Sequence, residues 1–139
     1  MSVVEVNELQ NEADIPIIKV VDGLPAFPWA RHFTLVRWGG DDSPFSKFQS
    51  LDDPELAFLV VEPSVFFPDY EPEIDDHAVE RLGLERSDQA LLLVILTTGD
   101  RPEDTTANLL GPIVVHRETL EAVQVVLADS THSTRVPIV

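Results

Sequence analysis

Four histidines are the side chains of this sequence best suited to binding a metal or moving a proton. A zinc site on a helix needs two histidines about one turn apart, so that both imidazoles project from one face. Here the histidines are scattered along the chain, at His32, His77, His116 and His132. We interpret each as a surface or half-buried side chain and predict no metal site.

Asp129, Ser130 and His132 are the residue types of a hydrolytic triad and lie close together in the sequence. Known triads are assembled from separate segments of the chain, and a nucleophilic serine in an elbow is flanked by glycines. Ser130 meets neither condition. The chain also has no cysteine, which excludes disulfides, thiolate metal sites and a cysteine nucleophile. We therefore predict that the protein is not an enzyme and has no cofactor.

Two further segments contain residues typical of phosphate or calcium loops. The run GGDD at residues 39–42 is followed by neither a lysine nor a helix, so it predicts a turn and not a phosphate-binding loop. The acidic residues of 69–76 are interrupted by Pro72 and lack the glycine-bearing pattern of an EF-hand. We interpret this segment as a solvated acidic loop.

The charge of the chain is strongly negative and unevenly placed. The net charge is −16 over 139 residues, and residues 41–104 alone carry 17 acidic against 4 basic side chains. Such a chain repels phosphate backbones, so we expect no direct nucleic-acid binding. The acidic middle could steer a basic partner toward the protein, or it could serve solubility alone.

The length and the apolar content of 44% fit one globular domain spanning residues 1–139. The first residues are acidic where a signal peptide needs a basic start. The longest apolar run, residues 90–96, is far short of the roughly 20 residues that span a bilayer. We expect a cytoplasmic protein with no membrane association. No coiled coil or large apolar patch is evident, so we expect a monomer.

Short runs rich in Val, Ile, Phe and Thr predict an all-β architecture, because prolines fall between the runs and not inside them. The runs are residues 3–6, 15–21, 32–38, 45–51, 57–61, 90–98, 107–110, 113–116 and 123–128. Within residues 32–38 the side chains alternate, with Phe33, Leu35 and Arg37 on one face and Thr34, Val36 and Trp38 on the other. We predict a mainly β, small antiparallel β-barrel-like single domain with one or two short helical segments.

One segment predicts a helix. Asp75 or Asp76 can cap its start, the apolar face carries Ala78, Val79 and Leu82, and Gly83 is a natural stop. A single helical turn is expected after Pro63.

Aromatic residues are concentrated in the acidic region. They are Phe45, Phe48, Phe58, Phe66, Phe67 and Tyr70. Most should face the core, since aromatic residues at strand spacing usually point inward. Phe66 and Phe67 are adjacent and cannot both face one interior from a strand. Either a short turn lets both pack inward, or one of them joins Tyr70 on a protein-binding patch rimmed by Asp69 and Glu71.

Six segments, in order, resemble elements of the flagellar assembly factor FliW family. They are DGLPAF at residue 22, SPFSKFQS at 43, DPELAFLVVEPSVFFPDYE at 53, VILTT at 94, TANLLGPIVVH at 106 and QVVLADSTHSTRVPI at 124. The sequence departs from the family pattern at five positions. Phe48 stands where leucine is common, Ala26 where glycine is, Gly111 where alanine is, His116 where asparagine is and His132 where tyrosine is. The turn at Ala26 should therefore need no positive φ.

The resemblance implies a small β-barrel-like regulator of flagellar assembly. Members of the family bind the RNA-binding regulator CsrA, relieve its repression of flagellin translation, and also bind flagellin. The residues we expect to contact a partner are Pro44, Phe45, Phe66, Phe67, Asp69, Tyr70, Glu71 and Asn108. Asn108 has an alternative role, as an amide that satisfies backbone groups at a strand end.

Two other classes remain open. One is a chaperone-like flagellin-binding factor without CsrA antagonism. The other is an enzyme or small-ligand barrel, which predicts a deep cavity with convergent titratable groups.

Overall fold

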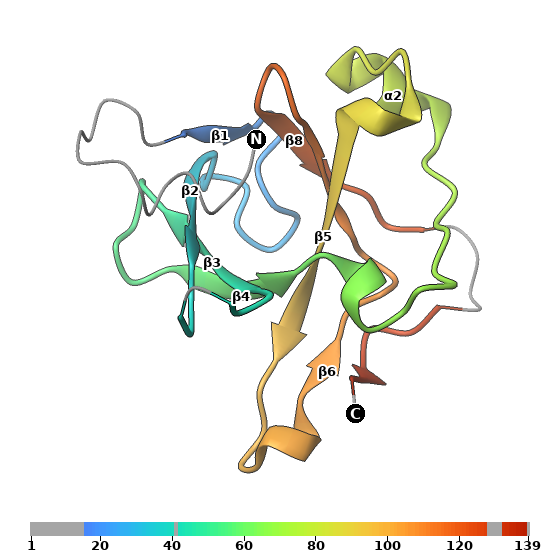
Figure 1. Ribbon diagram of the computed structural model, residues 1–139. Coiled ribbons are helices and arrows are strands. Elements are labelled where there is room, and N and C mark those ends of the chain that lie inside the picture. Colours follow the sequence, from blue (N-terminus) through green and yellow to red (C-terminus); the bar gives the residue numbers. More distant parts are fainter. Residues whose placement is uncertain (1–15, 41, 128–131, 139) are drawn as a thin grey trace.

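The computed structural model describes residues 16–40, 42–127 and 132–138 (Figure 1). Its strands are β1 (Ile18–Val20), β2 (His32–Arg37), β3 (Phe45–Ser50), β4 (Ala57–Val61), β5 (Ala90–Thr97), β6 (Thr106–Ala107), β7 (Ile113–His116), β8 (Glu121–Gln124) and β9 (Val136–Pro137). The helical segments are the α-helix α2 (Asp76–Leu82) and the single 3₁₀ turns η2 (Pro63–Val65), η3 (Ser87–Gln89) and η4 (Pro102–Asp104).

The strands close into a barrel. Hydrogen-bonded neighbours run β4-β3-β2-β1-β8-β7-β5, and β5 pairs back to β4 to complete the ring. The β1–β8 pair is parallel, whereas the other ladders are antiparallel. Parallel neighbours need a long connection, and here most of the chain lies between β1 and β8. The expected small antiparallel barrel is confirmed, with this one parallel pair.

The barrel interior is filled by side chains that alternate along the strands. Phe33 and Phe48 stack with ring centroids 4.3 Å apart, and Leu35 lies directly across from Phe48 in the β2–β3 ladder. All three are fully buried. The alternation predicted for residues 32–38 therefore places Phe33 and Leu35 in the core. Thr34 is buried as well, and its hydroxyl donates a hydrogen bond to the Pro16 carbonyl.

Helix α2 covers the outside of the barrel at β8. The Asp75 carboxylate accepts a hydrogen bond from the Ala78 N–H at 2.8 Å, and Gly83 ends the helix with a φ of 70°. Ala78 and Leu82 are buried against Val114 and Val123. The predicted cap and stop are confirmed. The predicted face is confirmed at Ala78 and Leu82, whereas Val79 is only half-buried. Within the described ranges, no helix is long and apolar enough to cross a membrane.

Some predicted strand boundaries are wrong. The run 107–110 is a strand only at its first residue, because the Asn108 side chain turns the chain by accepting hydrogen bonds from backbone N–H groups. In place of the run 123–128, the observed strand is β8, which begins two residues earlier and ends at Gln124. Its first residues, Glu121 and Ala122, pair with β1. Strand β9 was not expected from the sequence, and the run 3–6 lies outside the described residues.

The turn after β1 depends on a glycine. Gly23 has a φ of 70°, and a Cβ there would collide with the Pro28 backbone. Ala26 has no positive φ, as expected from the sequence. In the described part of the chain, Leu120 is the one non-glycine residue with a positive φ.

We predict that Gly23→Ala destabilises the protein by at least about 3 kcal/mol, since αL strain adds to a backbone clash. Gly83→Ala is the matched control, because Gly83 has the same φ but open space around it. We expect it to cost only about 1 kcal/mol. Urea unfolding of the two variants measures the difference, and equal losses of stability would contradict this account of Gly23.

Candidate protein-binding site

Four aromatic side chains gather on the outside of the barrel, next to η2. We call Phe45, Phe66, Phe67 and Tyr70 the aromatic patch. Pro63 starts the η2 turn, and the Pro63 carbonyl accepts hydrogen bonds from the N–H groups of both Phe66 (3.1 Å) and Phe67 (2.7 Å). This short turn lets both rings pack inward, half-buried, against the cluster of Val61, Val94, Leu96, Ala107 and Leu109. The Phe45 and Phe66 ring centroids are 5.9 Å apart.

Tyr70 fastens the end of this segment to the barrel. Its hydroxyl donates a 2.6 Å hydrogen bond to the Leu109 carbonyl, and its ring meets the His132 imidazole edge to face at 5.1 Å. Burial raises the pKa of the Tyr70 phenol to about 12. The aromatic patch is therefore held in one geometry, with only part of each ring exposed.

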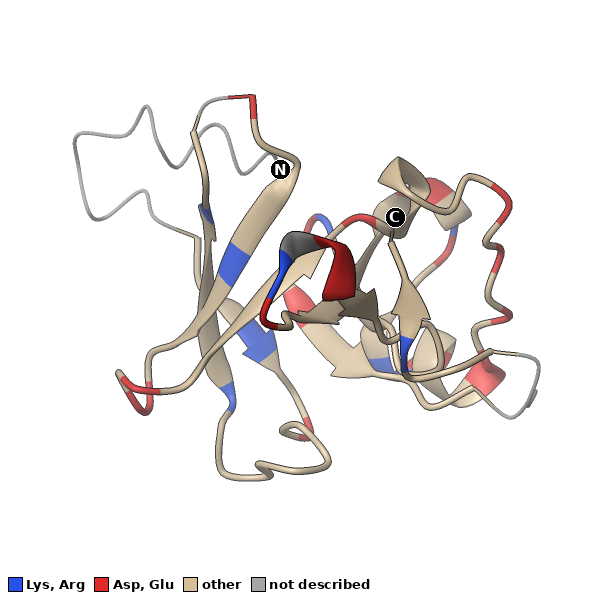
Figure 2. Ribbon diagram, turned by 90° about the horizontal axis from the view of Figure 1, so that it is seen from below, with Lys and Arg blue, Asp and Glu red and all other residues tan. Residues whose placement is uncertain are grey.

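Acidic side chains lie beside the aromatic patch at Tyr70 and continue toward α2. Asp69 and Glu71 flank Tyr70 and are exposed. Residues 71–76 then form one wall of a groove of about 770 Å³, with residues 125–127 and His132 on the other side; we call this the acidic groove. Figure 2 shows the acidic residues spaced along the loop that leads into the helix. A surface that combines aromatic and acidic groups suits a basic protein partner.

The other two predicted contact residues lie beside the aromatic patch. The Asn108 Oδ1 accepts hydrogen bonds from the N–H groups of Leu110 (3.1 Å) and Gly111 (3.0 Å), so the contacts match the backbone role weighed for it. Pro44 is exposed, immediately before Phe45, and lines the open end of the barrel.

The sequence did not reveal the apolar wall of the acidic groove. Val126 is 63% exposed there, although a strand had been predicted across it. A short, mostly apolar run does not show which of its residues will leave the ladder. Among the described residues, no group of three or more His, Asp or Glu side chains is placed to hold a metal ion.

The interpretation of His116 as a surface or half-buried side chain is wrong, and the residue has a structural role that the sequence did not predict. The imidazole is buried, and its Nδ1 accepts hydrogen bonds from the N–H groups of Glu118 (3.1 Å) and Thr119 (3.4 Å) in the turn between β7 and β8. The turn ends at Leu120, which has a φ of 61°. An asparagine oxygen can accept the same bonds, which explains how histidine can occupy a position where asparagine is common.

Comparison with known proteins identifies the class of barrel. A sequence model of the FliW protein family matches residues 4–138. A flagellar assembly factor FliW from Bacillus licheniformis is 40% identical over 94% of this chain and 90% of its own length. The Bacillus subtilis protein of the same name is 39% identical over 88% and 85%.

A solved structure agrees with the sequence matches. The crystal structure of a flagellar assembly factor FliW superimposes with a TM-score of 0.85 at 34% identity, covering 94% of this chain and 89% of that one. The chain belongs to the FliW family.

We predict that His116→Asn leaves the free energy of unfolding within about 1 kcal/mol of the parent, because the acceptor is kept. His116→Ala should cost about 2–4 kcal/mol, since it removes buried volume and leaves two turn N–H groups without their acceptor. Thermal and urea unfolding measure both. If asparagine proved as damaging as alanine, the hydrogen-bonding role would be wrong.

Tyr70 is the single tyrosine of the chain, so its titration can be followed by tyrosinate absorbance. We predict deprotonation near pH 12 in the folded protein and near pH 10 in urea. Because the pKa is higher in the folded state, the neutral phenol contributes to the stability of the fold. This contribution is fully present below pH 10 and is lost as the pH rises toward about 12. Phenylalanine has no hydroxyl to ionise, so Tyr70→Phe should lose less stability than the parent between pH 10 and about 12. A folded-state titration at the ordinary value would contradict the burial of the phenol.

Proposed function

We propose that this protein is a flagellar assembly factor that binds CsrA, antagonises it and thereby relieves repression of flagellin translation, and that it also binds flagellin. The observation that carries the proposal is the match to the FliW family over residues 4–138, among relatives named flagellar assembly factor. We further propose that it acts in the cytoplasm, as a monomer, by binding proteins and not nucleic acid.

Charge supports a CsrA partner. CsrA presents basic RNA-binding surfaces, and this chain carries five acidic and no basic residues between positions 69 and 76. Opposite charges increase the rate of encounter and orient the partners, and the effect falls as salt rises. The same negative surface disfavours RNA, which is consistent with a regulator that acts on the RNA-binding protein.

We propose the aromatic patch and its acidic rim as the partner-binding surface. Asp69 and Glu71 are exposed beside half-buried Tyr70, which supplies ring area with little loss of side-chain entropy on binding. Phe45, Phe66 and Phe67 contribute the apolar centre, and Pro44 extends it toward the barrel end. Asn108 acts indirectly, by fixing the backbone that receives the Tyr70 hydroxyl.

Isothermal titration with CsrA from the same organism, followed by flagellin as competitor, tests the proposal. We expect tight CsrA binding that weakens with salt and is displaced by flagellin. Flagellin binding without CsrA binding would instead establish the alternative, a chaperone-like flagellin-binding factor. Binding of neither protein would contradict both functions.

We predict that the double charge reversal Asp69→Lys with Glu71→Lys weakens CsrA binding at least about tenfold at low salt, because it replaces an attractive rim with a repulsive one. The loss should shrink as salt increases.

The matched control is Glu55→Lys with Glu80→Lys. Both glutamates are exposed, and the change in net charge is the same. We expect the control to weaken CsrA binding no more than about threefold, through the global field alone. Equal effects of the two double variants would remove the acidic rim from the binding surface while leaving general charge attraction in place.

A further inference from the structure

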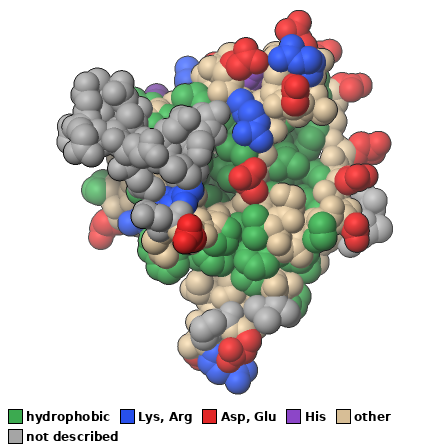
Figure 3. Space-filling model, viewed as in Figure 1, with side chains coloured by type: hydrophobic (Ala, Val, Ile, Leu, Met, Phe, Trp, Pro, Cys, Tyr) green, Lys and Arg blue, Asp and Glu red, His purple; other side chains and the backbone are tan. Residues whose placement is uncertain are grey.

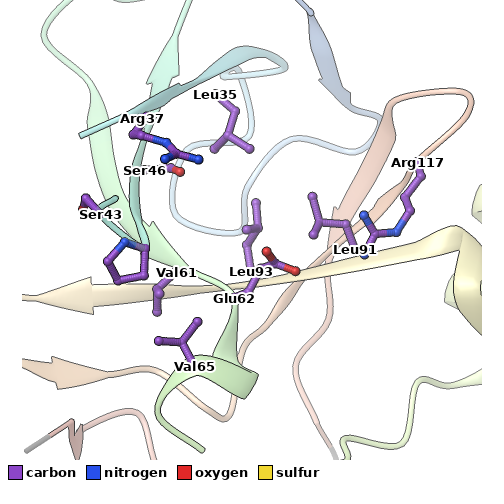
Figure 4. A pocket seen from close by; sticks show the side chains of 11 residues that line it. Leu35, Arg37, Ser43, Ser46, Val61, Glu62, Val65, Leu91, Leu93 and Arg117 are labelled. Atoms are coloured by element: carbon purple, nitrogen blue, oxygen red, sulfur yellow. The ribbon is translucent and has the colours of Figure 1, made fainter. Parts of the chain in front are cut away.

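In the part of the chain that the structure describes, the barrel is open at one end, and strand lengths explain why. β4 ends at Val61, which pairs with Val94, so residues 90–93 of β5 extend beyond it. Those residues pair with β7 on their other edge. A cavity of about 300 Å³ fills the gap (Figure 4). We call this cavity the barrel mouth; its volume is at the lower end of the range for small-molecule sites.

The barrel mouth has an apolar floor and a charged rim. Leu35, Leu91 and Leu93 belong to the barrel core and form the floor, and Val61 and Val65 close one side. In the space-filling view, hydrophobic side chains surround a hollow in the middle of this face, with basic and acidic side chains beside it (Figure 3).

Two arginines enter the barrel mouth from different elements. Arg37 ends β2, and Arg117 directly follows β7. Figure 4 shows the two guanidinium groups projecting over the cavity from opposite sides. Both side chains are half-buried, and no ion pair or side-chain hydrogen bond ties either of them to the described residues. A chain with 9 basic and 25 acidic residues thus places two arginines at one apolar opening.

The remaining polar groups limit the charge of a ligand. Glu62 also lines the barrel mouth, so the three ionised groups sum to one positive charge. The Ser43 and Ser46 side chains add hydroxyl groups on the same rim. Guanidinium groups match the planar fork of a carboxylate. A single carboxylate balances this net charge of one, whereas a phosphate dianion would leave the site with a net negative charge.

We propose that the barrel mouth binds a small aliphatic monocarboxylate. Its carboxylate lies between Arg37 and Arg117, and its hydrocarbon part packs on Leu35, Leu91 and Leu93. The site lies on the barrel end and does not depend on CsrA or flagellin binding.

Hexanoate is the probe, used below its critical micelle concentration with the full chain and followed by two-dimensional ¹H–¹⁵N NMR. We expect saturable shifts of the backbone amides around residues 35–37, 61–65, 91–93 and 117. Affinity should rise from acetate through butanoate to hexanoate by up to about fourfold per methylene. Hexylammonium and inorganic phosphate should bind at least about tenfold more weakly than hexanoate.

Arg37→Gln and Arg117→Gln should each weaken hexanoate binding about tenfold, since each removes a charge-assisted hydrogen bond. Arg101→Gln is the matched control, because Arg101 directly precedes the η4 turn and does not line the barrel mouth, and its substitution removes the same charge. It should leave the affinity unchanged. Val65→Trp, at a half-exposed position on the rim, should block entry while the melting temperature stays close to that of the parent.

Three results would overturn the proposal. The first is the absence of saturable shifts at the barrel mouth, and the second is equal binding of hexylammonium. The third is an Arg101→Gln effect as large as that of the two rim arginines, which would reduce the interaction to general charge.

Discussion

The length of β5 is the constraint on which the rest of this structure depends. With eight residues, β5 is longer than each strand that pairs with it, so different parts of its two edges pair with different strands. The first half pairs with β7, while residues 94–96 pair with β4 and residues 96–97 pair with β6. Because every strand in a closed ring needs a neighbour on each side, this division closes the barrel, carries β6 and β9 outside it, and leaves one end open.

Both candidate sites follow from that division. Where β4 stops, the chain turns through η2, and the two sides of this turn face different surroundings. Val65 lines the barrel mouth, whereas Phe66 and Phe67 pack on the outer cluster formed by Val94, Leu96 and Leu109. These apolar residues thus cover strand faces that would otherwise be exposed to water beyond the end of β4. The half-exposed residues at the border of this apolar surface are accessible to a ligand or a protein.

The aromatic patch is held in one arrangement by contacts within the fold. Two N–H groups bonded to the Pro63 carbonyl set the turn, and the Tyr70 hydroxyl fastens its far end to Leu109. Ordering these side chains in the free protein reduces the entropy lost on binding. The acidic residues that follow are exposed and sit beside this fixed surface, so they can attract a basic partner without themselves contributing to the core.

The sequence by itself determined the elements whose signals are local. The alternation around Phe33 and Leu35, the Asp75 cap and the Gly83 stop depend on neighbours a few residues apart, and they were predicted correctly. The family likewise follows from the ordered motifs. Tertiary structure alone decided the parallel β1–β8 pair and the placing of Arg37 and Arg117 at one cavity. These depend on which segments far apart in the chain become neighbours, and in a barrel that choice is made by ring closure and not by local preference.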